Sequence, residues 1–251
     1  MEDIFISNDN NAAFKHSYFE KYIFHLTNIL KNQSQDNFVI CLHAFDAINS
    51  IIQNKNHLEI IKKIVNQIFE ILISLTCSIE ISQYFDLIQD LFQDYFWYFD
   101  KKEIFLDALM KNLNQRILSE MSKIVGSPQL SNIYINKSWN IIRSISEDKH
   151  FLPNYIEIIE KNLYPLFELL KDPMQIDFDE DIFLLIAEFI KKSHRISSLQ
   201  RQVFPYLKFY FEKYHCVFGN LFSTIHYYIY YGKDFFSADH KCLDLVIFIY
   251  S

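Results

Sequence analysis

Glycine and proline are scarce in this chain: its 251 residues include 3 glycines and 5 prolines. Hairpins and bulges depend on these two residues, so the composition nearly excludes a β-sandwich or a β-barrel. No Gly-x-Gly or Gly-x-x-x-x-Gly-Lys stretch occurs, which excludes the glycine-rich loops that cradle phosphates. The 4 cysteines lie far apart and form no Cys-x-x-Cys pair, so neither a zinc knuckle nor a redox motif is expected. Scattered buried thiols in a reducing compartment are the better interpretation.

Basic residues are outnumbered, with 24 Lys and Arg against 31 Asp and Glu and a net charge of -7. Phosphate binding needs a basic face, so direct nucleic-acid binding is not expected, whereas basic protein partners are compatible with this charge. The N-terminus lacks the basic and apolar regions of a signal peptide. The longest apolar runs, such as 182–190, are too short to span a membrane. We therefore expect a soluble intracellular protein without a membrane partner.

Apolar residues are abundant, at 50% of the chain, and 17% of the residues are aromatic, which excludes a disordered chain. They recur at three- and four-residue spacing almost everywhere, which predicts an all-α protein. The region around 133–145 follows this spacing less regularly. Predicted helices cover residues 14–29, 38–52, 61–75, 84–96, 104–113, 155–170, 182–190, 199–214 and 222–230, with a last one from Ser237.

The breaks between these segments carry residues typical of helix starts. Asp100 with Glu103, and Ser197 with Gln200, have the spacing of capping boxes. Pro153 suits the first turn of a helix, where its missing N–H has no partner anyway. Gly126-Ser127-Pro128 is the clearest interruption. We expect a disordered polar N-terminus over residues 1–12 and a single helical array over 13–251, with a soft break near 126–130.

An internal repeat predicts how the helices are arranged. At a constant offset, Ile60 aligns with Ile158 and the Phe69-Glu70-Ile71-Leu72 stretch with Phe167-Glu168-Leu169-Leu170. The offset corresponds to about two HEAT or armadillo units of roughly 40–47 residues each. Chance agreement in a chain rich in Ile, Leu and Phe is the alternative, but the connecting turns also match in length. Together with helices that are apolar on more than one stripe, the repeat predicts an α-solenoid of stacked antiparallel helix pairs, a HEAT/armadillo-like superhelix.

One acidic run is a candidate binding site, formed by Asp177, Asp179, Glu180 and Asp181. These carboxylates would hold a basic segment of a partner or a divalent cation. Alternatively they lie in a first helical turn, where negative charge favours the helix dipole, and this structural interpretation is preferred. An EF-hand is excluded because the loop glycine and the final glutamate do not follow.

A second candidate is the densest aromatic patch of the chain, with tyrosines at 227, 228, 230 and 231. On one helix, Tyr227, Tyr228, Tyr230 and Tyr231 cannot all face one core, so some must meet a neighbouring helix, solvent or a partner. Exposed aromatic residues often mark contact surfaces. A further helix of a longer array would explain them equally well.

Catalytic chemistry has no recognisable motif in the sequence. The 9 histidines form no His-Glu-x-x-His or His-x-x-x-His pair, so no metal site is expected. No serine, cysteine or threonine has a readable base motif such as Gly-x-Ser-x-Gly. We therefore expect no enzymatic activity, no catalytic residues and no cofactor.

One stretch carries a resemblance to a known family. Ser74-Leu75-Thr76-Cys77 is followed by Gln83, Phe85, Leu87, Ile88 and Phe92. This order resembles the C-terminal half of the importin-beta superfamily of nuclear transport receptors, in the importin seven and importin eight branch. There, a similar Ser-Leu-Thr-Cys precedes a Ser-Pro-Gln segment, a Trp and a Leu-Leu pair. The helix from Ala44 to the Asn-rich turn at 54–56 is also similar, and the resemblance covers residues 38–113.

Several departures accompany this resemblance. Ser82 stands where the family has proline, and Phe85 where it has tryptophan. The Ran-binding segment of the family lies in its N-terminal repeats, and nothing in this chain matches it. Members of the family are several times longer. We therefore expect either a C-terminal fragment or a truncated relative.

The resemblance implies a nuclear transport receptor that binds protein cargo in nucleocytoplasmic import. It implies basic cargo such as ribosomal proteins or histones, the Phe-Gly repeats of nucleoporins as further partners, and a location in cytoplasm and nucleus. The alternative hypothesis is a non-enzymatic helical scaffold subunit of a larger assembly, with the Tyr227–Tyr231 region as an obligate interface. A transport array would concentrate Asp and Glu on its concave helices, whereas a scaffold need not.

Overall fold

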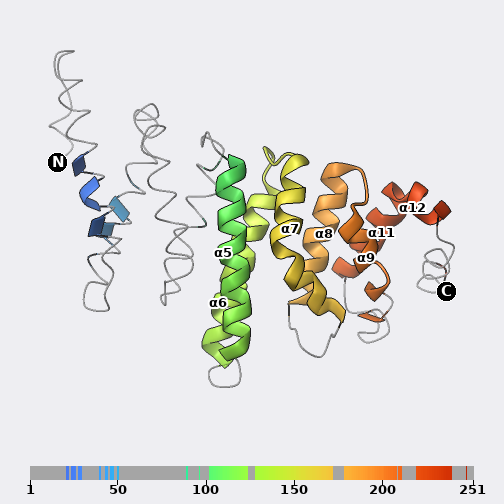
Figure 1. The fold of residues 1–251 in the computed structure, drawn as a ribbon, viewed down its shortest axis with the longest axis horizontal. Helices are drawn as coiled ribbons and strands as arrows, with labels where there is room; N and C mark the ends of the chain where they lie inside the picture. Colours follow the sequence, from blue (N-terminus) through green and yellow to red (C-terminus); the bar gives the residue numbers. More distant parts are fainter. Residues whose placement is uncertain are drawn as a thin grey trace, which may run out of the picture. The chain divides into compact units, whose positions relative to one another are not determined.

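The computed structural model describes helices, and no strand, among the residues it covers (Figure 1), which confirms the all-α prediction. The described residues are mainly 102–123, 128–171, 178–207, 209–210 and 219–238, with isolated positions at 21–22, 24–26, 28–29, 40, 43–44, 46–47, 50, 89, 96 and 247. The chain divides into two compact units, Met1–Lys102 and Glu103–Ser251. Nearly all the features below belong to the second unit.

The order of the described helices along the chain is as follows. They are α5 (Lys102–Lys123), α6 (Pro128–Glu147), α7 (Asn154–Glu168), the 3-10 turn η6 (Leu169–Lys171), α8 (Asp179–Ser193), α9 (Ser198–Val203), α11 (Gly219–Tyr231) and α12 (Lys233–Ala238). The predicted helices over 104–113, 155–170, 182–190 and 222–230 are confirmed. The less regular region around 133–145 is one continuous helix of 20 residues.

Two helix predictions for the C-terminal part need correction. The predicted helix over 199–214 is interrupted, because α9 ends at Val203 and Phe204 and Pro205 form a turn. Proline cannot donate the backbone hydrogen bond that would continue the helix. The helix expected from Ser237 begins earlier, at Lys233, so that Phe235 and Phe236 can pack on Phe204, with ring centroids 5.2 and 5.4 Å away.

Two chain reversals explain how neighbouring helices come close. The α8 helix ends at His194, which adopts a left-handed conformation at φ 55°. Gly232 separates α11 from α12, and a Cβ atom there would collide with the carbonyl oxygen of Tyr228 and the side chain of Ile196. Glycine is therefore required at position 232 by close packing rather than by its backbone angles.

Two helix-start predictions can be compared with the structure. Ser197 and Gln200 form a complete capping box at the start of α9, as predicted. Pro153 immediately precedes the first residue of α7, one position before the predicted first turn.

Other predictions lie outside the described residues: the 1–12 tail, the helix over 61–75, the Asp100 cap, the first copy of the internal repeat and the residues between 74 and 92 that carry the family resemblance. The predicted break near 126–130 overlaps the undescribed residues 124–127, and α6 begins at Pro128.

Alternate helices run in the same direction. From α5 to α7, Asn154 donates to Glu103 at 3.1 Å and Asn162 donates to Asp107 at 2.9 Å. Because the residue numbers of the bonded pairs increase in the same direction on both helices, α5 and α7 are parallel. Gln200 of α9 then donates to Glu160 of α7 at 2.8 Å. We call α5, α7 and α9 the first row.

The remaining long helices form a second row, α6, α8 and α11. Between α6 and α8, the rings of Trp139 and Phe178 lie 5.6 Å apart, and Arg143 pairs with Asp181 at 3.1 Å. Lys192, near the end of α8, donates to the carbonyl oxygen of Asp148, just after α6, at 2.6 Å. The residue numbers of these contacting pairs also increase together, so α6 and α8 are parallel.

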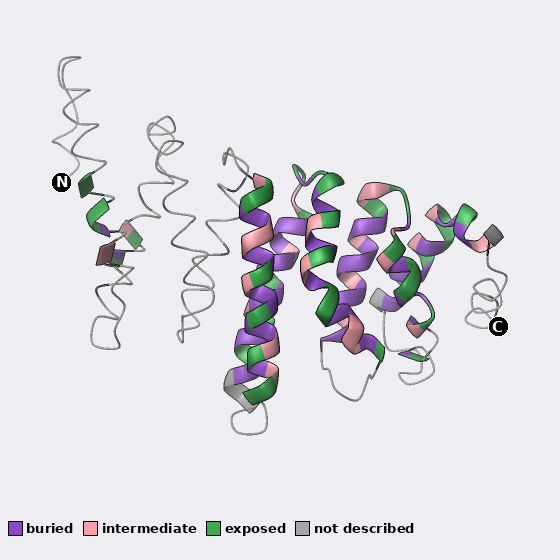
Figure 2. Cartoon of the chain, viewed as in Figure 1, coloured by how far each residue is buried: buried purple, intermediate pink, exposed green. Residues whose placement is uncertain are grey.

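The α11 helix runs parallel to α8. Thr224 donates to the carbonyl oxygen of Phe183 at 2.9 Å, and the rings of His194 and Tyr231 lie 4.8 Å apart. Buried residues recur along α5, α7 and α8 (Figure 2). Those of α8 span a broad arc of the helix, which contacts both α6 and α11.

Removing a side chain from this core should destabilise the protein strongly. Leu163 of α7 is fully buried, so we expect Leu163→Ala to lower the free energy of unfolding by about 2–5 kcal/mol. Urea denaturation of the full chain followed by far-UV circular dichroism measures the change. The control is Tyr164→Ala on the same helix, because Tyr164 is 42% exposed and should cost about 0.5 kcal/mol or less. Equal effects of both substitutions would contradict the described packing.

Candidate functional site

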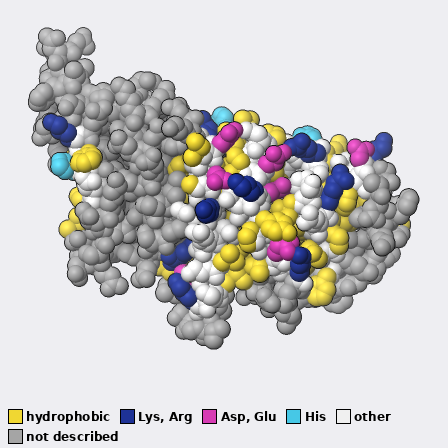
Figure 3. Space-filling view, viewed as in Figure 1, with side chains coloured by type: hydrophobic (Ala, Val, Ile, Leu, Met, Phe, Trp, Pro, Cys, Tyr) yellow, Lys and Arg dark blue, Asp and Glu magenta, His cyan; other side chains and the backbone are white. Residues whose placement is uncertain are grey.

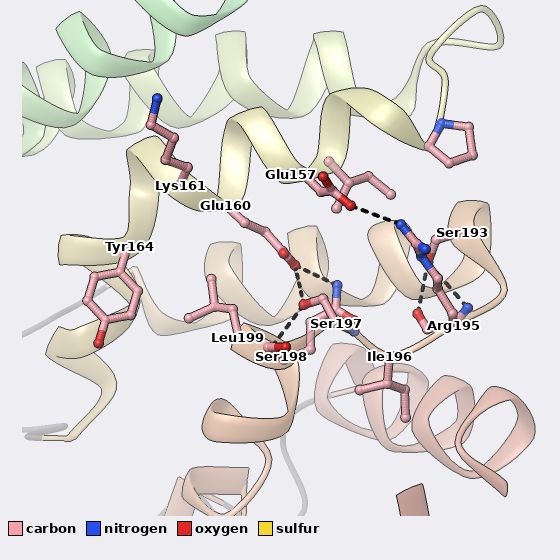
Figure 4. Close-up of a pocket in the computed structure, with 13 residues that line it drawn as sticks. Glu157, Glu160, Lys161, Tyr164, Ser193, Arg195, Ile196, Ser197, Ser198 and Leu199 are labelled. Atoms are coloured by element: carbon pink, nitrogen blue, oxygen red, sulfur yellow. Dashed lines mark hydrogen bonds and ion pairs between the residues drawn. The ribbon is translucent and has the colours of Figure 1, made fainter. Parts of the chain in front are cut away.

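An open groove lies between α7 and the turn that joins α8 to α9 (Figure 4). It encloses a volume of about 660 Å³. Its apolar lining consists of Pro153, Ile156, Ile196 and Leu199, and its polar lining of Glu157, Glu160, Lys161, Tyr164, Ser193, Arg195, Ser197, Ser198 and Gln200. We call this feature the α7–α9 groove.

Glu160 is the most deeply placed charged residue of the groove, with only 7% of its surface exposed. The hydroxyl of Ser197 donates to its Oε1 atom at 2.9 Å, and Nε2 of Gln200 donates to the same atom at 2.8 Å. Burial raises the pKa of this carboxyl group, although both hydrogen bonds act in the opposite direction. Figure 4 shows the Glu160 side chain extending from α7 toward Ser197.

The capping box at the start of α9 positions both donors. The Ser197 hydroxyl accepts a hydrogen bond from the backbone N–H of Gln200 at 3.1 Å. The backbone N–H of Ser197 donates in turn to Oε1 of Gln200 at 2.9 Å. This reciprocal pair fixes both side chains, because each has one of its hydrogen-bonding atoms engaged at the helix start. The donors therefore face Glu160 in a preorganised arrangement.

The two cationic side chains of the groove already have carboxylate partners. Arg195 pairs with Glu157 at 3.1 Å across the rim. Lys161 pairs with Asp107 of α5 at 3.3 Å. Both pairs are largely exposed, so each contributes at most about 1 kcal/mol to stability.

The lining of the groove contains no histidine or cysteine, and the Ser197 hydroxyl is engaged with Glu160 and the helix start. Across the described part of the chain, no group of three His, Cys, Asp or Glu side chains is placed to hold a metal ion. None of the described helices is long and apolar enough to cross a membrane.

The predicted acidic run lies at the start of α8, which contains Asp179, Glu180 and Asp181 in its first turn. Asp179 is buried and Glu180 is half-buried. Asp181 pairs with Arg143 of α6, although burial still raises the pKa of its carboxyl group. Asp177 lies outside the described residues. These placements agree with the structural interpretation of the run, since Asp181 links two helices of the second row.

The four predicted tyrosines of α11 divide between core and surface, as the sequence required. Tyr228 is fully buried, and its hydroxyl donates to the carbonyl oxygen of Gln200 at 2.7 Å. Tyr227 and Tyr231 are half-buried and stack on each other, with ring centroids 6.4 Å apart. Tyr230 is 70% exposed. Tyr228 therefore serves the packing of α11, while Tyr230 is available at the surface.

Tyr230 belongs to a larger exposed stripe on α11, formed with Phe222, His226 and Ile229. We call these four residues the α11 surface. Phe222, His226 and Tyr230 follow one another at four-residue spacing, so they lie along one face of the helix. The rings of His226 and Tyr230 stack at 6.2 Å. Of these residues, the sequence-based prediction included Tyr230 but missed His226, which lies four residues before it, and Ile229, which lies three residues after His226.

Charges of opposite sign are interspersed on the face shown in Figure 3 rather than gathered by sign. Most described carboxylates on α5 to α8 are engaged within the chain. Those in ion pairs are Asp107, Glu120, Glu147, Glu157, Glu168, Asp181 and Glu188.

Comparison with known proteins identifies no relative: no family model, no curated protein and no solved structure matches this chain.

The buried hydroxyl of Tyr228 should contribute measurably to stability. Tyr228→Phe removes its hydrogen bond and leaves the carbonyl oxygen of Gln200 without this donor, so we expect a loss of about 1 kcal/mol in the free energy of unfolding. Tyr230→Phe is the matched control and should change stability by about 0.5 kcal/mol or less. Chemical denaturation of both variants measures the difference, and a neutral Tyr228→Phe would show that the bond is dispensable.

Glu160 should make stability depend on pH in a defined direction. Burial raises the pKa of the Glu160 carboxyl group in the folded state above the ordinary value of 4.5. Folding is therefore more favourable while this group is protonated, and that stability is lost as pH rises through the folded-state pKa. Glu160→Gln keeps an oxygen that can accept both hydrogen bonds and removes the titration. We therefore expect the stability of Glu160→Gln relative to the parent protein to increase between about pH 4 and about pH 7.

The control for this pH series is Glu157→Gln, which alters an exposed carboxylate on the same helix. Urea denaturation at each pH gives the free energies. A constant difference between Glu160→Gln and the parent protein over this range would contradict a raised pKa.

Proposed function

We propose that the chain is a non-enzymatic α-solenoid that binds a protein partner, and that the α11 surface contributes to this binding. The observation that carries the proposal is the parallel direction of alternate helices, described above for α5 with α7, for α6 with α8 and for α8 with α11. Stacked antiparallel helix pairs produce this arrangement, because every second helix returns to the original direction.

The α11 surface supports a role in partner binding. Large aromatic side chains are enriched at protein interfaces, where they bury much area at low entropic cost. Tyr230 and Phe222 are exposed although the same helix buries Tyr228 and Ile225 completely. Tyr230, which is 70% exposed, therefore keeps most of its side chain outside the packing of α11 on α8.

Of the two functional hypotheses, these observations favour the scaffold subunit. A receptor for basic cargo would present free carboxylates, whereas the described carboxylates of α5 to α8 are mostly paired within the chain. The nuclear transport receptor remains a more specific proposal. It rests on the resemblance over residues 38–113. The proposals of basic cargo, of Phe-Gly nucleoporins as partners and of a location in cytoplasm and nucleus depend on the same resemblance.

Site-directed photo-crosslinking tests the proposal. We expect the full chain with p-benzoylphenylalanine at position 230 to form a protein adduct of one defined mass in extracts of its native cells. The same reagent at Asn140, an exposed position of α6, should not form it. Phe222→Ser in the crosslinking chain should reduce the adduct at least about fivefold, since it removes a neighbouring contact residue.

Two outcomes decide between the hypotheses. Competition of the adduct by a Phe-Gly repeat peptide would favour the transport receptor, whereas resistance to the peptide would favour the scaffold subunit. Equal labelling from positions 230 and 140, or the absence of a defined adduct, would overturn a partner role of the α11 surface.

A further inference from the structure

We infer that the α7–α9 groove receives a lysine side chain of a partner protein, with its ammonium group against Oε2 of Glu160. The inference takes from the proposed function only that the ligand belongs to a protein. It concerns a different surface from α11, and no residue is shared between the two.

The first argument is the charge of the groove. Four charged side chains line it, and three of them have a partner of opposite charge: Glu157 pairs with Arg195, and Lys161 pairs with Asp107. Glu160 has no cationic partner among the described residues, although it is the most buried of the four. A buried carboxylate without a counter-ion is costly, and an incoming cation would offset this cost.

The second argument is the hydrogen bonding of the carboxylate. Ser197 and Gln200 both donate to Oε1 of Glu160. In the described part of the chain, Oε2 accepts no hydrogen bond, so one oxygen remains for a ligand. Carboxylate and guanidinium recognise each other best through two parallel bonds, which need both oxygens. An ammonium group is a compact charge that can bind a single oxygen, so the geometry favours lysine over arginine.

The third argument is the composition of the walls. Ile156 of α7 and Leu199 of α9 line the groove beside Glu160. Apolar walls suit the four-carbon stem of a lysine, which buries its methylene groups while its charged end is paired. The groove is open to solvent on one side, which allows such a side chain to enter from outside.

The raised pKa of Glu160 agrees with this assignment, because burial is its main cause. A nearby positive charge would favour the ionised carboxylate and lower that pKa. The other titratable groups that line the groove are Glu157, Lys161, Tyr164 and Arg195. Arg195 lowers the pKa of Glu160 only as the smallest of the effects on it, because its guanidinium group pairs with Glu157, and Lys161 pairs with Asp107.

A small-molecule titration tests the inference on the full chain without a protein partner. The probes are n-butylammonium, n-butylguanidinium and n-butanol, and the readout is the side-chain amide signal of Gln200 in protein labelled with ¹⁵N-glutamine. We expect saturable shifts with n-butylammonium, weaker binding of n-butylguanidinium and no saturation with n-butanol. Glu160→Gln should weaken n-butylammonium binding about tenfold, and Glu157→Gln should change it less than about twofold.

Several results would overturn the inference. One is equal affinity of n-butylammonium for the parent protein and for Glu160→Gln with retained circular dichroism. A second is tighter binding of n-butylguanidinium, which would assign the groove to arginine. A third is saturation by n-butanol, which would show an apolar site only. The three probes on the parent protein keep the test decisive even if Glu160→Gln does not fold. Failure of the crosslink at position 230 would leave this titration unaffected, so the two proposals fail separately.

Discussion

The structure depends on the burial of apolar side chains between helices that are not consecutive in the chain. The α8 helix buries Ile182, Phe183, Leu185, Ile186, Ala187, Phe189 and Ile190, a broad arc that one neighbour cannot cover, and it contacts both α6 and α11. Parallel packing of alternate helices provides these two neighbours, and the polar contacts within each row then fix the register. Asp107 with Asn162, Arg143 with Asp181 and Thr224 with the Phe183 carbonyl each join helices that are not consecutive in the chain.

Much of the secondary structure could be predicted because it depends on local pattern. Three- and four-residue spacing located α5, α7, α8 and α11, and the capping box at Ser197 located the start of α9. The errors occurred where other effects prevail over spacing. Pro205 stops a helix that the apolar pattern would continue, and packing of Phe235 and Phe236 on Phe204 draws α12 one turn earlier.

The candidate site was less predictable, because it depends on which helices become neighbours. Ser197 and Gln200 were recognisable as a cap, but their second role as donors to Glu160 requires α7 to lie beside α9. Spacing alone indicated that the tyrosines of α11 could not share one environment. Only the neighbours of that helix determine that Tyr228 is buried and Tyr230 exposed. The ion pair between Asp181 and Arg143 likewise could not be predicted without knowing that α6 lies beside α8.

The left-handed residue at the end of α8 has a consequence for both surfaces. His194 bears a side chain where glycine would fit the backbone more easily, and its ring lies against Tyr231, one residue from the exposed Tyr230. The same reversal directs the chain into Arg195 and Ser197, which line the groove. A single bend therefore positions residues of both surfaces: it places His194 against Tyr231 of α11, and Arg195 and Ser197 in the lining of the groove.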